Sequence, residues 1–127
     1  RYKSVGSTGW WDIEKFRNYC LSKQETTESF PFDEDTLVFK VAGKMFALVS
    51  LTEKPMTVNL KMNPEIILEW REHYSEITPG FHMNKQYWNS VEFNKSIPPS
   101  ELKWLIDHSY SEVVKKLPKK VRMRFEV

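Results

Sequence analysis

The chain has a single cysteine, Cys20, among 127 residues, so no disulfide can form within it. Its three histidines are not grouped with cysteine at the spacing of a zinc site, and we expect no metal and no cofactor. The sequence lacks an apolar run of about 18 residues and a charged-then-apolar leader. We therefore expect neither membrane insertion nor secretion, and a reducing, cytoplasmic setting.

Glycine is scarce, with four residues, whereas five tryptophans contribute to an aromatic content of 14%. This composition favours one compact domain with an aromatic-rich core. Two of the glycines fall within RYKSVGSTGW at the start, which shows no hydrophobic period. We expect residues 1–11 to be a linker or a remnant of expression, residues 12–118 to be the domain, and residues 119–127 to be a basic C-terminal tail.

The net charge of +2 is unevenly distributed along the chain. Residues 115–127 hold six basic residues and one acid, a local charge of +5, which leaves −3 for residues 1–114. A duplex-binding protein usually carries a clustered positive footprint, and here the cluster lies at the C-terminus. The tail could be an arm that follows a phosphate backbone, a solvated tail, or a terminal strand.

Hydrophobic periodicity predicts helices and strands along the domain. A helix capped by Asp12 is followed by a polar segment whose Phe30-Pro31-Phe32 forms an apolar, core-directed plug. Asn63-Pro64-Glu65 is typical of a second helix start, and Pro98-Pro99 opens a third. The predicted strands are residues 36–41, 45–51, 56–62, 80–83 and 86–93.

The predicted order is therefore α-β-β-β-α-β-β-α. We expect an α+β, two-layer sandwich in which an antiparallel sheet carries helices on one face. Such a sheet can leave its other face open to solvent, where a partner would bind.

Four segments together resemble the MmcQ/YjbR family of small bacterial proteins. They are FPFDEDTLVFKVAGKMFALVSL, VNLKMNPE, PGFHMNKQYWNSV and LIDHSY, and the resemblance covers roughly residues 12–117. It implies a two-layer YjbR-like fold, in some accounts with wing-like hairpins, and DNA as the partner. A likeness of this fold to frataxin-type proteins raises iron binding, but the first helix sets Asp12 and Glu14 against Lys15 and Arg17, so no acidic ridge exists for a hard cation.

Three lysines on predicted strands, Lys40, Lys44 and Lys61, could form a basic patch on the open face or a hairpin. Arg71, at the end of the second helix, would extend it. The alternative is that these are edge and turn lysines that serve solubility and oppose edge pairing. Glu28 could form a structural ion pair with Lys40 or Lys44.

The stretch PGFHMNKQYWNSV supplies the other candidates. His82 and Lys85 could contact a phosphate, or serve only as a structural hydrogen-bonding group and a solvated edge residue. Asn84, Tyr87 and Trp88 could line a pocket with His82, although burial of Trp88 in the sheet is favoured. An enzyme is disfavoured because no nucleophile, metal set or phosphate loop accompanies His82.

The sequence therefore predicts a non-enzymatic DNA-binding module that contacts the phosphate backbone through sheet and hairpin lysines. The alternative is a small-molecule or protein-binding domain with its pocket around His82 and Trp88.

Overall fold

The sheet has six antiparallel strands in the order β1-β2-β3-β4-β6-β5. The computed structural model describes residues 11–53, 55–80, 83–93 and 97–125. Within these ranges the strands are β1 (Thr26–Ser29), β2 (Thr36–Val41), β3 (Lys44–Ser50), β4 (Thr57–Lys61), β5 (Ile77–Pro79) and β6 (Trp88–Glu92). The helices are α1 (Ile13–Leu21), α2 (Ile67–His73), α3 (Pro99–Val114), α4 (Lys119–Arg122) and the 3-10 turn η1 (Met123–Phe125).

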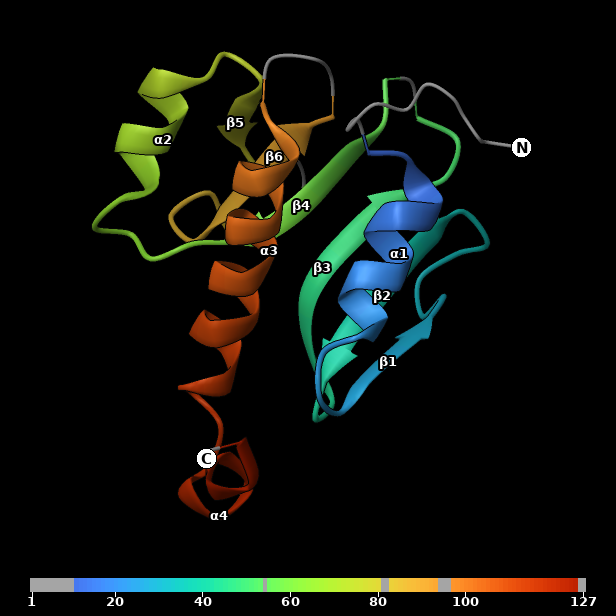
Figure 1. Ribbon diagram of the computed structural model, residues 1–127, viewed down its shortest axis with the longest axis vertical. Helices are drawn as coiled ribbons and strands as arrows, with labels where there is room; N and C mark the ends of the chain where they lie inside the picture. The colour runs from blue at the N-terminus through green and yellow to red at the C-terminus, as the bar shows by residue number, and fades with distance from the viewer. Residues whose placement is uncertain (1–10, 54, 81–82, 94–96, 126–127) are drawn as a thin grey trace.

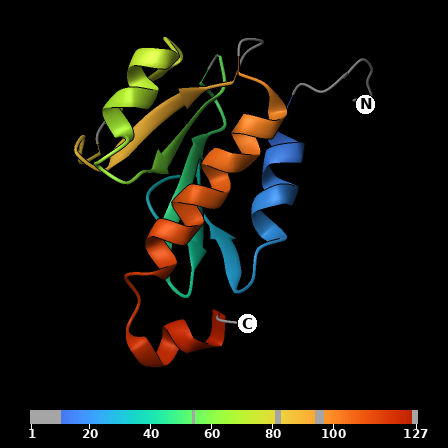
Figure 2. The ribbon, with the colours of Figure 1, turned by 60° about the vertical axis from the view of Figure 1, so that its left-hand side comes forward.

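One face of the sheet carries the helices, as the sequence predicts (Figures 1 and 2). Alternation sends Leu37, Phe39 and Val41 of β2 into the main core. There they meet Phe16 of α1 and Leu105 of α3, all fully or almost fully buried. The predicted two-layer α+β architecture is therefore confirmed.

The opposite face carries a second, smaller cluster. Val38, Leu48 and Trp88 are buried in it, and Met83 and Tyr87 pack against them. Trp88 is only 8% exposed, so the expectation that it is buried is confirmed. Most of this open face is nevertheless free of a helical layer (Figure 2).

Local sequence signals explain two boundaries. The Asp12 carboxylate accepts a hydrogen bond from the Lys15 amide at 2.9 Å and caps α1 as predicted. Ala42 and Gly43 both have positive φ, 49° and 86°, which matches the twist of a two-residue hairpin between β2 and β3.

A β-bulge in β3 shapes the centre of the sheet. Phe39 pairs with Ala47, whereas Lys40 pairs with Met45, so Phe46 is the extra residue. Phe46 and Ala47 both reach the helix-side core, and Met45 packs on the open face. The bulge thus gives the core an additional aromatic ring.

The predicted element order lacked the first strand. Thr26–Ser29 pairs with β2, so four strands precede α2 rather than three. The prediction that Phe30 and Phe32 form a core plug is also wrong, because they are 47% and 64% exposed. Glu28 forms its ion pair with Arg17 at 2.5 Å, not with a lysine, since its register partner Phe39 faces the helices.

Two further boundaries differ from the prediction. Asn63 begins a turn, in which its side-chain oxygen accepts from the Glu65 amide at 2.8 Å, and α2 itself starts only at Ile67. After Pro118 the chain forms α4 and η1, so the terminal strand considered for the tail is wrong, and its role as an arm on a phosphate backbone stays a prediction. Among the described residues, no helix is both long and apolar enough to cross a membrane.

Candidate functional site

Four of the predicted lysines lie at the same end of the sheet. Lys40 is next to the last residue of β2, Lys44 opens β3, and Lys61 closes β4. Lys61 is paired with Trp88 at the start of β6, and Lys85 lies three residues before that strand. Because neighbouring strands run antiparallel, these ends coincide, and a row across four strands spans roughly 14 Å.

The lysines share this end rather than one face. Lys40 and Lys61 follow the open-face alternation, whereas Lys44 is paired with Val41, whose side chain is in the helix-side core. Lys44 and Lys85 are exposed, and Lys40 and Lys61 are half-buried. Within the described ranges none of the four forms an ion pair with a carboxylate, so their charge is available to an anionic partner.

Arg71 has an internal role. Its Nε donates to the Asn89 side-chain oxygen at 2.7 Å, and its Nη2 donates to the carbonyls of Lys85 and, at 3.3 Å, Trp88. Partial burial lowers the pKa of the guanidinium. Arg71 therefore holds the segment before β6 against α2, and its predicted DNA contact stays a prediction.

The β5–β6 connection is held by its own polar groups. Lys85 Nζ donates to the Gly80 carbonyl at 2.9 Å, and the Asn84 side-chain oxygen accepts from the Gln86 amide at 2.9 Å. A side chain at Gly80 would place its Cβ 2.9 Å from that of Trp88, so the close approach requires glycine. His82, the remaining candidate in this stretch, lies outside the described residues.

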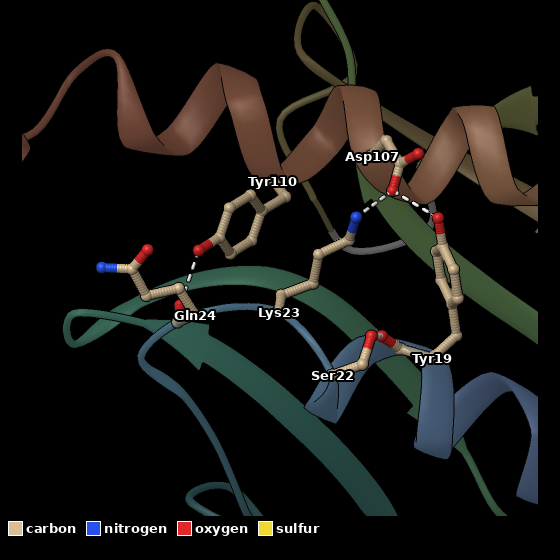
Figure 3. Close-up of polar contacts among 6 residues, drawn as sticks. All are labelled: Tyr19, Ser22, Lys23, Gln24, Asp107 and Tyr110. Carbon is tan, nitrogen blue, oxygen red and sulfur yellow. Dashed lines mark hydrogen bonds and ion pairs between the residues drawn. The ribbon is translucent and has the colours of Figure 1, made fainter. Parts of the chain in front are cut away.

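Four consecutive polar residues in the segment LIDHSY, Leu105–Tyr110, hold α3 to distant parts of the chain. Asp107 accepts from the Tyr19 hydroxyl at 2.7 Å and from the Lys23 ammonium, while Tyr110 donates to the Gln24 carbonyl at 2.5 Å (Figure 3). The Lys23 ammonium lies 4.8 Å from the centre of the Tyr19 ring. Burial, followed by the bond to Asp107, raises the pKa of Tyr19 to about 12.

The other two polar residues of this segment, His108 and Ser109, bond to backbone groups of β3, of β4 and of the turn after β4. His108 Nε2 accepts from the Asn63 amide at 3.1 Å, which leaves the ring proton on Nδ1. Ser109 donates to the Phe46 carbonyl at 2.6 Å and accepts from the Lys61 amide at 2.8 Å. The polar residues of this signature segment therefore serve the fold, which the sequence pattern did not reveal.

The predicted pocket residues Asn84, Tyr87 and Trp88 do not line the cavity found on the open face. The volume of this cavity is about 650 Å³. Its walls include Phe32, Met45, Leu48, Asn59 and Met83.

An acidic cleft is lined by residues of α2 and the start of α3, and Figure 1 shows α2 at the end of the molecule away from α4. Glu69, Glu72 and Glu101 line this cavity of about 560 Å³ together with Trp70 and His73. Next to it, Trp104 is stacked between Trp70 at 5.2 Å and His108 at 4.8 Å. Trp104 nevertheless stays 44% exposed, and the carboxylates would repel a phosphate.

Known proteins are similar to this chain in sequence and in fold. The YjbR family model matches residues 21–112. The chain belongs to the YjbR family. Because the match ends at residue 112, α4 and η1 lie beyond it.

The YjbR relatives come from different bacteria. The chain is 33% identical over 110 residues to the uncharacterised protein YjbR of Escherichia coli K12, covering 87% of this chain and 93% of that protein. It is 38% identical over 108 residues to the uncharacterised protein YyaQ of Bacillus subtilis, covering 85% and 86%. The crystal structure of Deinococcus radiodurans protein DR2400, a DUF419 domain, superposes with a TM-score of 0.86 at 36% identity, covering 92% and 89%.

Proposed function

We propose that this YjbR-family domain is a non-enzymatic DNA-binding module that holds the phosphate backbone at the lysine-bearing end of its sheet. The observation that carries the proposal is the coincidence of Lys40, Lys44, Lys61 and Lys85 at one end of four strands. Their row of roughly 14 Å corresponds to about four base-pair steps of duplex.

The distribution of charge supports one direction of approach. The acidic cleft lies at the α2 end, and the basic tail lies at the other end of α3 (Figure 1). A polyanion would therefore be steered toward the sheet-end lysines and the tail. Lysines provide sequence-independent contacts, so the expected recognition is of the backbone and not of particular bases.

The test is fluorescence anisotropy of a labelled duplex of about 20 base pairs at several salt concentrations between about 50 and 200 mM. We expect Lys40→Gln with Lys61→Gln to weaken binding and to reduce the salt slope by about 1.8, because two phosphate contacts are lost. The matched control is Lys15→Gln with Lys103→Gln, which removes the same charge from exposed positions on α1 and α3.

Equal losses in both double variants would show that only net charge matters and would overturn the proposed site. Wild-type protein that does not bind the duplex in a salt-dependent way would overturn DNA binding itself.

A second candidate is a small-molecule site in the open-face cavity. Its apolar walls at Met45, Leu48 and Met83, with the Asn59 amide among them, fit the usual composition of a ligand pocket. A ligand bound there would raise the melting temperature by mass action with little dependence on salt. Met45→Trp would fill the cavity and remove that stabilisation, whereas DNA affinity would persist.

A further inference from the structure

The basic C-terminal segment is folded against the body of the domain. α4 and η1 lie at the C-terminal end of α3, beside the tip of the β2–β3 hairpin (Figures 1 and 2). The Arg124 guanidinium forms a two-pronged ion pair with Glu25, with Nε–Oε2 at 2.7 Å and Nη2–Oε1 at 2.6 Å. Gln24 Nε2 adds a hydrogen bond to the Arg124 carbonyl at 2.8 Å.

The residues that hold the tail are themselves fixed from two sides. The Gln24 carbonyl accepts from the Tyr110 hydroxyl of α3 at 2.5 Å, and the Glu25 carbonyl accepts from the Ala42 amide in the hairpin turn at 3.2 Å. Glu25 has φ 57°, an unusual conformation for a residue other than glycine, so its position is set by these surroundings. Phe125 adds an edge-on contact with Tyr110 at 6.3 Å.

Docking in this way brings positive charge to the hairpin. Lys119 and Lys120 of α4 are exposed, and within the described ranges neither is ion-paired. The β2–β3 hairpin, whose tip lies near α4, carries Lys40 and Lys44 (Figures 1 and 2). A free tail would spread its cations over many positions, whereas the docked tail holds α4 at this end of the domain without a further loss of conformational entropy on binding.

We propose that Glu25 is a positioning residue for nucleic-acid binding: its ion pair with Arg124 holds the tail lysines in line with the lysines of the sheet end. The inference rests on the proposed function. It makes a prediction opposite in sign to simple electrostatics, because removing an acid from a basic surface should by itself strengthen DNA binding.

The test compares Glu25→Gln, Arg124→Gln and the exchanged pair Glu25→Arg with Arg124→Glu in the full chain, with Glu34→Gln as the matched loss of an exposed acid. Anisotropy with the same duplex gives affinity and salt slope, and amide hydrogen exchange over residues 119–125 reports docking. We expect Glu25→Gln to weaken binding on the order of fivefold and to lower the salt slope by up to about 1.8, as two tail contacts lose their fixed position.

Arg124→Gln, which also removes a positive charge, should weaken binding at least as much as Glu25→Gln, and both should raise exchange in the tail. The exchanged pair, which keeps the net charge, should restore affinity and protection, while Glu34→Gln should leave affinity equal or slightly tighter. Glu25→Gln binding at least as tightly as Glu34→Gln would overturn the inference and leave the proposed function standing. Wild-type protein that fails to bind the duplex would overturn both, even if the exchange data show a docked tail.

Discussion

Replacing Ser109 with alanine should expose how α3 and the bulged strand depend on one hydroxyl. Ser109 is fully buried on α3. It donates to the Phe46 carbonyl and accepts from the Lys61 amide, at 2.6 and 2.8 Å. Phe46 is the bulge residue of the β2–β3 pair, and the β3–β4 ladder ends beside it at the pair Ala47–Leu60, so the Phe46 carbonyl and the Lys61 amide lie just past that end.

The magnitude follows from those two groups. In Ser109→Ala a buried carbonyl and a buried N–H each lose a partner, and an unmet buried group costs about 1–3 kcal/mol. We expect the free energy of unfolding to fall by about 2–6 kcal/mol in total. For a chain of this length that corresponds to a melting temperature lower by roughly 8–24 °C.

Urea denaturation followed by circular dichroism measures this change, with the slope m expected to stay constant. Ser111→Ala is the matched control, since it makes the same replacement at an exposed position of the same helix and carries the same gain in helix propensity. The free energy of unfolding of Ser111→Ala should remain within about 0.5 kcal/mol of the wild-type value. A Ser109→Ala protein as stable as Ser111→Ala would refute the view that this hydroxyl completes the bulge.

Two further predictions concern pH. Burial lowers the pKa of His108 below 6.5, so the stabilisation that neutral His108 provides is fully present above that pH and is lost as the pH falls below it. Urea titrations should show this loss of unfolding free energy in wild type and in a variant of the exposed His73. The profile of His108→Gln should be much flatter. The pKa of Tyr19, through burial and Asp107, and that of Tyr74, through its bond to Glu101, are raised from 10.0 to about 12. Their stabilisation should be complete below pH 10 and lost between pH 10 and 12, and an ultraviolet phenolate titration should lose one late-ionising group in Tyr19→Phe; a late group that persists there would contradict the assignment.

The sequence predicted the elements whose signals are local. Alternation placed Leu37 and Phe39 on the core side of β2, and the carboxylate of Asp12 marked the start of α1. β1 was missed because TTES is short, polar and paired on one side only, so burial leaves little pattern in it. The prediction that Phe30 is buried was wrong because an apolar side chain is not always buried.

The candidate site was predictable in its residues but not in its arrangement. Lys40 and Lys61 were chosen from strand alternation, yet only the strand order and pairing show that they lie at the same end of the sheet. No local sequence pattern indicated that Arg71 bonds to Asn89 and the Trp88 carbonyl, because those partners are 18 and 17 residues away.

The sequence by itself determined the family, the alternation of two sheet faces and the separation of a mildly acidic body from a basic tail. Each of these depends on neighbours within a few residues or on composition. The tertiary structure alone decided that Ser109 completes the bulge at Phe46, that Glu25 binds Arg124 across 99 residues, and that the tail lies beside the hairpin. Such contacts depend on which distant segments the packed core brings together. A local pattern of residues does not show which distant segments will meet.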